Sequence, residues 1–257
     1  MRIFYAEALG TFILASSLNF MADYSHGGQK VNILEIVLGF LIAVQFARKF
    51  SGAHVNPGVT LACYLTGSEK DKKKISDNIK EYIGGQFLGG MLSPIISQAL
   101  TGHHLSLKIS IEARFIGAFI MEMIGAAVFY SIIVIQGSPK LNLTSGDGFV
   151  SSACVSMGLA SGISIAGNES GAGLNPAISV SQNIISLITT RDIASLKYTL
   201  IYILAPVAAA YLTQFVYNLL YGDDENASNS NINYRDSREE LRVIPDKFKD
   251  KSEERLI

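Results

Sequence analysis

Two ten-residue stretches of the chain carry the same pattern, SGAHVNPGVT at 51–60 and SGAGLNPAIS at 170–179. In each, an Asn comes directly before a Pro. Asn is a favoured residue just before a helix, and Pro at the first helical position loses no hydrogen bond. The pattern therefore predicts one helix that begins after Asn56 and another that begins after Asn175.

The chemistry of such a pair follows from two helix starts and two side-chain amides. The N-terminus of a helix carries a partial positive charge, and an Asn amide donates hydrogen bonds. Two of each, facing one another inside a membrane, repel cations and orient a passing water so that it donates outward on both sides, which interrupts proton transfer. The pair suits uncharged solutes that accept hydrogen bonds, while the small Ser-Gly-Ala segments before it offer backbone carbonyls.

The surrounding sequence is that of a membrane protein. It is 49% hydrophobic and 17% charged, with a mean hydropathy of +0.30. A bilayer core requires about 20 apolar residues of helix. Six stretches meet this length: about 3–22, 33–50, 79–100, 112–136, 149–167 and 197–221. Two shorter apolar pieces, 57–66 and 176–188, follow the Asn-Pro pairs and are too short to span, so they predict re-entrant half-helices around a cavity.

The same elements occur twice. Glu7-x-x-Gly10 in the first span matches Glu122-x-x-Gly125 in the fourth, and the Asn-Pro pairs match each other. Three spans and one half-helix make a repeat, at about 1–105 and again at 112–222. Because each repeat has an odd number of spans, the second copy is inverted in the membrane. The predicted fold is an all-α membrane protein with six transmembrane helices and two re-entrant half-helices.

The remaining features bound the function. Lys and Arg gather between 48 and 80, which places both termini on the cytoplasmic side. Residues 223–257 are polar and charged, and predict a disordered cytoplasmic tail after a channel domain at 1–222. Cys63 and Cys154 stand alone in apolar sequence, so we expect neither a disulfide nor a metal site. The sequence has no recognisable catalytic residues and predicts no cofactor, and its near-neutral charge gives no argument for binding nucleic acid.

Over residues 1–222 the chain resembles the aquaporin family, the major intrinsic proteins. The resemblance lies in the Asn-Pro-Gly and Asn-Pro-Ala boxes, Ser-Gly-Ala-His before the first, Ala-Glu-x-x-Gly-Thr in the first span, Gly-Gln at 85–86 and Ala-Pro at 205–206. It implies a passive channel in the lipid bilayer of a plasma or internal membrane, with a pore in each protomer of a homotetramer. The box residues would meet at the pore centre: Asn56, Pro57, Gly58, Asn175, Pro176 and Ala177.

The sequence departs from the family pattern at the pore. Gly58 replaces the usual Ala of the first box, and Ile178 stands where members usually carry an Arg that projects into the outer constriction. By spacing from the boxes, the other constriction positions fall on Ile36, on Gly162 or Ile163, and on Ala172. This filter is apolar, and with a small residue in the fifth span it would be wide. It predicts an aquaglyceroporin-like channel that passes water and small solutes such as glycerol, urea or ammonia.

Other interpretations remain open. Arg114 or Arg191 could replace the missing Arg, or bulk could fill the gap and make conduction poor. A non-conducting structural protein would have the same fold. A secondary transporter needs a coupling carboxylate near the helix breaks, whereas Glu35 and Glu169 are closer to a membrane edge.

Three further residues have predicted roles. Glu7 and Glu122 are expected to be structural and to accept hydrogen bonds from the loops before the half-helices. His54 is expected to line the cytoplasmic vestibule.

Overall fold

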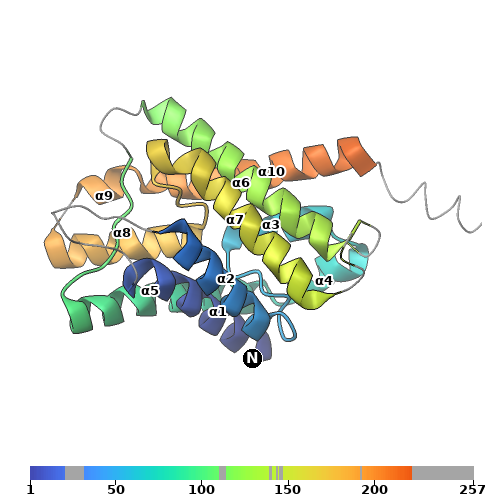
Figure 1. Ribbon diagram of the computed structural model, residues 1–257, viewed down its shortest axis with the longest axis horizontal. Helices are drawn as coiled ribbons and strands as arrows, with labels where there is room; N and C mark the ends of the chain where they lie inside the picture. Colours follow the sequence, from blue (N-terminus) through green and yellow to red (C-terminus); the bar gives the residue numbers. More distant parts are fainter. Residues whose placement is uncertain are drawn as a thin grey trace, which may run out of the picture. The chain divides into compact units, whose positions relative to one another are not determined.

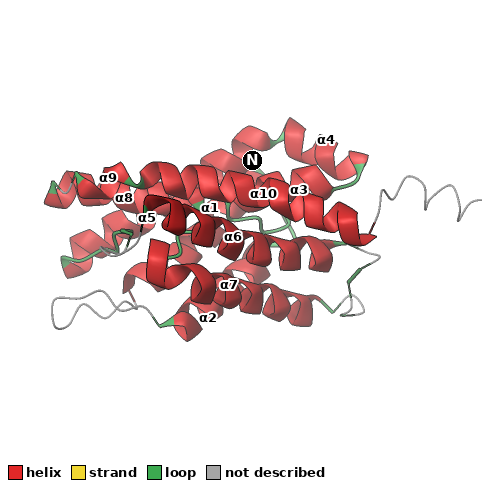
Figure 2. Cartoon of the chain, turned by 90° about the horizontal axis from the view of Figure 1, so that it is seen from above, coloured by secondary structure: helices red, strands yellow, loops and turns green. Residues whose placement is uncertain are grey.

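The structure is a computed structural model that describes residues 1–20, 32–109, 114–138, 141–142, 144, 147–191 and 193–221. Every regular element in these ranges is a helix (Figure 2). The chain divides into two compact units, Met1–Val216 and Tyr217–Ile257. The second is described only as far as Tyr221, whose ring lies 5.5 Å from that of Tyr217. The predicted tail, 223–257, lies outside the described residues, and all candidate site residues lie in the first unit.

Six long helices correspond to the six predicted spans. They are α1 (Arg2–Phe20), α2 (Ile33–Ala47), α5 (Ile79–Thr101), α6 (Phe115–Gly137), α7 (Gly148–Ser170) and α10 (Thr199–Tyr221). Within the described ranges, α1, α6, α7 and α10 are long and apolar enough to cross a membrane. Helix α5 is equally long, but its sequence includes several glycines and Pro94. Helix α2 is shorter than predicted, because the chain turns after Ala47 and reaches Ser51 outside a helix.

Four shorter helices complete the described chain. The half-helices are α3 (Pro57–Thr66) and α8 (Pro176–Thr190), and both start at the predicted Pro. Helices α4 (Glu69–Asp77) and α9 (Ala194–Lys197) were not predicted. In Figure 1, α3 and α8 extend from the middle of the fold toward opposite ends.

The long helices pack against one another both within and between the repeats. Helix α1 lies against α2 and α5, α6 lies against α7, and the repeats meet where α2 contacts α7 and α5 contacts α8. Glycines allow the closest approach. A Cβ atom added to Gly89 of α5 would lie 2.2 Å from the backbone oxygen of Ala8, and one on Gly85 would lie 2.4 Å from that of Phe4. These glycines therefore pack against α1 within the same chain.

Each half-helix is capped by the Asn that precedes it. The Asn56 Oδ1 accepts from the backbone N–H groups of Gly58, at 2.8 Å, and Val59, at 3.4 Å. The Asn175 Oδ1 accepts from those of Ala177, at 3.1 Å, and Ile178, at 3.4 Å. The caps satisfy N–H groups that no helical carbonyl can reach, which is why the helices begin here.

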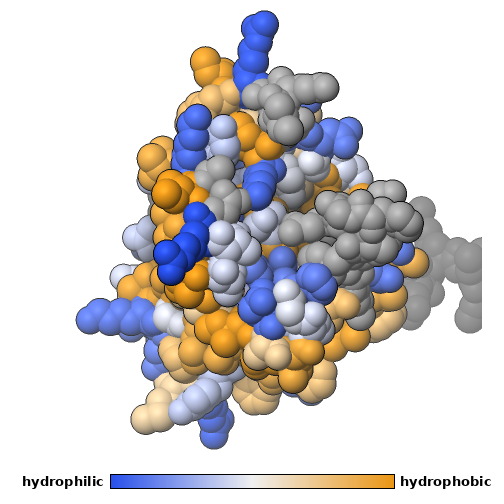
Figure 3. All heavy atoms as spheres, turned by 90° about the vertical axis from the view of Figure 1, so that its left-hand side faces the viewer, coloured by the Kyte–Doolittle hydropathy of each residue, from blue (hydrophilic) through white to orange (hydrophobic). Residues whose placement is uncertain are grey.

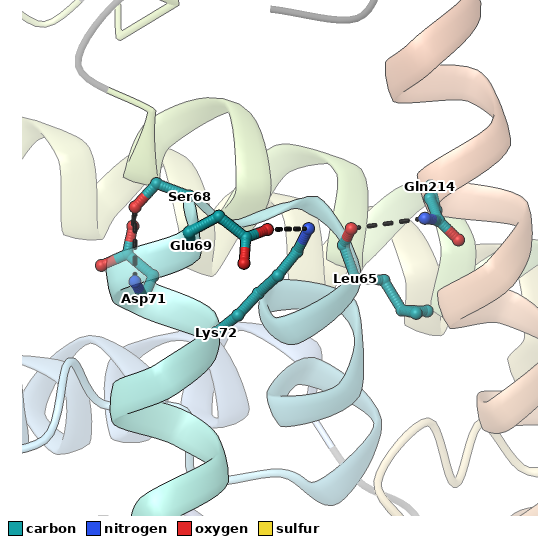
Figure 4. Close-up of polar contacts among 6 residues, drawn as sticks. All are labelled: Leu65, Ser68, Glu69, Asp71, Lys72 and Gln214. Atoms are coloured by element: carbon teal, nitrogen blue, oxygen red, sulfur yellow. Dashed lines mark hydrogen bonds and ion pairs between the residues drawn. The ribbon is translucent and has the colours of Figure 1, made fainter. Parts of the chain in front are cut away.

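The far end of α3 is also held (Figure 4). The Gln214 amide of α10 donates to the Leu65 carbonyl at 3.3 Å, which satisfies one of the last carbonyls of the half-helix. Ser68 then caps α4 by accepting from the backbone N–H of Asp71 at 3.3 Å.

On the end toward which α8 runs, hydrophilic residues in the centre are bordered by hydrophobic residues along the lower edge (Figure 3), as expected where water meets a membrane rim.

Candidate functional site

The two capping asparagines meet at the centre of the fold. The Asn56 amide donates to the Leu174 carbonyl at 2.8 Å, and the Asn175 amide donates to the Val55 carbonyl at 2.8 Å. Each Asn thus bonds to the residue that precedes the other Asn. The half-helices are therefore tied tip to tip by two reciprocal hydrogen bonds between the repeats.

The asparagine amides have donor capacity beyond these two bonds. A side-chain amide has two N–H groups, and each Asn uses one of them across the repeat boundary. Both asparagines line a cavity of about 40 Å³. A solute there would meet the asparagine amides, with the partial positive charge of two helix N-termini behind them.

Four of the predicted constriction residues line the same cavity: Ile36 of α2, Ile163 of α7, Ala172 and Ile178. Gly162 does not. It packs against Gly125 of α6, and a Cβ atom at Gly162 would lie 2.6 Å from the Gly125 oxygen. Of the two positions that the sequence left open, the structure therefore places Ile163 at the cavity and Gly162 in a helix contact.

Seven further lining residues were missed by the sequence interpretation. They are Leu14, Leu18, Phe40, Val55, Phe129, Leu159 and Leu174. Helical spacing could have found some of them, because Phe40 lies one turn after Ile36 and Leu159 one turn before Ile163. The rings of Phe40 and Phe129 are 5.5 Å apart in an edge-to-face arrangement.

The lining is apolar apart from the asparagines and the loop backbone. Within the described ranges, no charged side chain lines the cavity. Arg114 precedes α6 and Arg191 follows α8, so both stand at helix ends rather than at the cavity. The structure therefore places neither Arg in the position that Ile178 occupies.

The loops that lead into the half-helices are strained in the same way in both repeats. Ala53 and Val55 have φ values of 57° and 44°, and the matching Ala172 and Leu174 have 53° and 44°. This left-handed region is unfavourable for residues with a side chain, above all for a β-branched one such as Val55. Such strain persists only where the surroundings hold it.

Two buried carboxylates hold these loops. The Glu7 side chain accepts from the backbone N–H groups of His54, at 3.0 Å, and Val55, at 2.6 Å. Glu122 accepts from the N–H of Gly173 at 3.2 Å, from that of Leu174 and from the Ser170 hydroxyl. Both carboxylates are fully buried, and neither lines the cavity.

The remaining predicted residues surround this centre. The buried His54 ring stacks on Tyr82 with centroids 4.6 Å apart, its Nδ1 lies 3.2 Å from the Thr60 hydroxyl, and it does not line the cavity. Pro57 faces a separate groove of about 290 Å³. Pro176 and Ala177 are buried.

Among the residues that the structure describes, neither cysteine has the partners of a metal site. Cys63 and Cys154 are free and partly buried. In the described part of the chain, no group of three or more His, Cys, Asp or Glu side chains could hold a metal ion.

The chain is similar in sequence to known aquaporin and glycerol-facilitator proteins. The chain is 28% identical over 224 residues to the probable aquaporin NIP7-1 of Arabidopsis thaliana, a match that covers 84% of this chain and 76% of that one. It is 29% identical over 237 residues to the glycerol uptake facilitator protein-like 6 of Lactiplantibacillus plantarum, covering 87% and 100%.

A solved structure has the same fold. The aquaglyceroporin from Plasmodium falciparum superposes with a TM-score of 0.65 at 21% identity, covering 84% of this chain and 95% of that one. The model of the family described as "Major intrinsic protein" matches residues 1–217. The chain belongs to this family, whose members are passive membrane channels for water and small solutes rather than enzymes.

Proposed function

We propose that this protein is a passive channel for water and small uncharged solutes such as glycerol, urea or ammonia, and that the paired asparagines exclude protons and cations. The observation that carries the proposal is the reciprocal pair of amide–carbonyl bonds, which holds both Asn side chains at the cavity. A water that accepts from both cannot pass a proton along the file. A glycerol uptake facilitator-like protein among the relatives supports glycerol as one of the solutes.

The outer filter in this proposal is apolar. Ile36, Ile163 and Ile178 line the cavity with no cationic side chain among the described lining residues. An apolar wall offers no donor of its own, so a solute at this level keeps hydrogen bonds only with the asparagine amides, the loop carbonyls and the water beside it. Exclusion of cations then depends on the two helix N-termini.

One observation favours a second candidate. The cavity holds only about 40 Å³ and bulky apolar side chains line it, including Phe40 and Phe129. A protein of this fold that conducts poorly and serves a structural role would have such a cavity. The transporter alternative has less support, because neither Glu35 nor Glu169 lines the cavity.

Swelling of proteoliposomes in a stopped-flow instrument separates these candidates. The channel requires fast water flux with a low activation energy and no dependence on an ion gradient. Slow flux in both water and glycerol gradients, from vesicles shown to contain folded protein, would leave the structural role. Flux that needs an ion gradient would instead identify a transporter.

The filter is tested by Ile178→Arg. An Arg at this position adds bulk and donors at the cavity, so we expect glycerol flux to fall by roughly tenfold, equivalent to about 1.4 kcal/mol of added barrier, while water flux is retained. Ile178→Leu is the control, since it conserves volume and polarity and should leave both fluxes near those of the original protein. Unchanged glycerol flux in Ile178→Arg would show that residue 178 is not at the constriction.

We also propose that both termini are cytoplasmic and that the chain forms a homotetramer. The first proposal rests on the Lys and Arg residues between α2 and α5, and the second on membership of the family. Labelling of a single introduced Cys at each end, in intact cells and in opened ones, tests the orientation. The mass of the complex in detergent tests the assembly.

A further inference from the structure

The Gly of the first box has no room for a side chain. A Cβ atom added to Gly58 would lie 2.0 Å from the Tyr130 hydroxyl oxygen, 2.7 Å from Tyr130 Cζ and 2.9 Å from Cε2. Non-bonded carbon atoms do not approach so closely. The Tyr130 side chain therefore occupies the space that an Ala methyl group would need at this position of the box.

Tyr130 also bonds to the other box. It lies on α6, is fully buried, and donates its hydroxyl to the Leu174 carbonyl at 2.8 Å. This is the carbonyl that accepts from the Asn56 amide, also at 2.8 Å. One side chain thus fills the gap in the first box and binds the residue that precedes Asn175 in the second.

At the matching positions of the other repeat, the helix residue is small and the box residue is the larger one. When Glu7 is matched to Glu122, Ala15 corresponds to Tyr130, and when the boxes are matched, Ala177 corresponds to Gly58. A small helix residue therefore accompanies Ala in one box, and a large one accompanies Gly in the other. Ala15 has no hydroxyl to bring to the Val55 carbonyl, which accepts from the Asn175 amide.

We infer that Tyr130 is a positioning residue of the paired-asparagine constriction, whose ring replaces the methyl group missing at Gly58 and whose hydroxyl fixes the Leu174 carbonyl to which Asn56 donates. The part of the inference that concerns conduction rests on the proposed channel function. The part that concerns packing does not. The two residues form one unit, so a change at either should be tolerated only with a matching change at the other.

A double-mutant cycle tests the packing. Gly58→Ala alone should lower the melting temperature of the purified protein by roughly 5 °C, because it overpacks a filled site. Tyr130→Leu ends at the Cδ atoms and so removes the three atoms that meet the new methyl group. The loss of melting temperature in the double variant Gly58→Ala with Tyr130→Leu should therefore be well below the sum of the losses in the two single variants. Gly117→Ala is the control for Gly58→Ala, because a Cβ atom there meets nothing within 4 Å.

The hydroxyl is tested by Tyr130→Phe, which keeps the ring and leaves Leu174 with the Asn56 bond. We expect the ratio of glycerol to water permeability to change by roughly threefold, as one hydrogen bond that sets the constriction is lost. Tyr211→Phe, an exposed residue of α10, is the control and should leave the ratio unchanged. The ratio is measured in the same vesicles, so a smaller amount of folded protein does not alter it.

The outcomes separate the inference from the proposed function. Melting effects that simply add in the double variant would overturn the pairing of Gly58 and Tyr130, whether or not the protein conducts. An unchanged permeability ratio in Tyr130→Phe would overturn the role of the hydroxyl. If the unaltered protein conducts nothing while the melting effects couple, the channel function and the hydroxyl's effect on conduction fail together, and the packing unit stands.

Discussion

At the scale of single residues, buried carboxylates and strained loops depend on each other. Val55 and Leu174 adopt a left-handed backbone conformation, and Glu7 and Glu122 accept the N–H groups of those same residues. A carboxylate accepts several bonds at once and donates none when ionised, which suits a loop whose N–H groups all point one way. The Glu7 carboxylate also accepts from the Gln86 amide at 2.7 Å.

Glu7→Gln tests this dependence. The amide keeps the size of the carboxyl group but turns one acceptor into a donor, so at least one of the N–H groups of His54 and Val55 loses its partner. An unsatisfied buried donor costs about 1–3 kcal/mol, and we expect a lower melting temperature by roughly 2–10 °C. Thermal unfolding of the purified protein measures this change in melting temperature. Glu169→Gln, which replaces a carboxylate outside the loop contacts, is the control. Equal melting temperatures in all three proteins would contradict the structural role of Glu7.

The sequence could predict the site only where spacing from the boxes is certain. Asn56, Asn175 and Ile178 belong to the boxes or follow them directly, and Ile36 and Ala172 were placed by counting. Spacing from the second box fits either Gly162 or Ile163, because one extra residue before Asn175 shifts the register. The contact between Tyr130 and Gly58 joins different repeats, and only the packed fold brings them together.

At the scale of elements, apolar length and Asn-Pro starts predicted all six spans and both half-helices. The misses have physical reasons. Helix α4 is polar on most of its surface and buries only Ile75, so a search for apolar runs interprets it as a loop. The span predicted at 33–50 was too long, because residues that are apolar or basic continue past the turn at Ala47.

The contact between α1 and α5 leads to an element-scale prediction for Gly89→Ala. In an exposed helix, this change stabilises by up to about 1 kcal/mol through helix propensity. Here the new methyl group meets the Ala8 oxygen at 2.2 Å and the Phe12 nitrogen at 2.7 Å, both on backbone that cannot rotate away. The cost of overpacking should therefore exceed the gain in helix propensity, and we expect the free energy of unfolding to fall by about 1–3 kcal/mol.

The measurement is the melting temperature in detergent, with Gly117→Ala of α6 as the comparison. A Cβ atom added to Gly117 would meet nothing within 4 Å, so the same substitution should be neutral or stabilising there. The sign of the change in melting temperature in Gly89→Ala distinguishes overpacking from a gain in helix propensity. A more stable Gly89→Ala protein would mean that α1 and α5 do not approach so closely.

At the scale of the whole molecule, the cavity at the paired asparagines belongs to neither repeat alone. Each Asn caps its own half-helix and donates to a carbonyl of the other repeat, across Asn56–Leu174 and Asn175–Val55. The cavity takes lining residues from α1, α2, α6 and α7 as well as from the boxes. A site that needs both repeats forms only when the two inverted halves have packed together.

The same argument predicts which part of the chain can be removed without loss of conduction. Both boxes, both buried carboxylates and every described lining residue lie within Met1–Val216, and the family match ends at residue 217. A chain truncated after Gly222 keeps all of these groups and the whole of α10. We therefore expect it to conduct water at the rate of the full chain, per molecule of protein, in stopped-flow swelling of proteoliposomes. Full-length and truncated proteins at equal density in matched vesicles provide the comparison. If the truncated protein is folded by its melting temperature but conducts more slowly or faster, residues 223–257 regulate the pore, and the constriction alone does not set the rate.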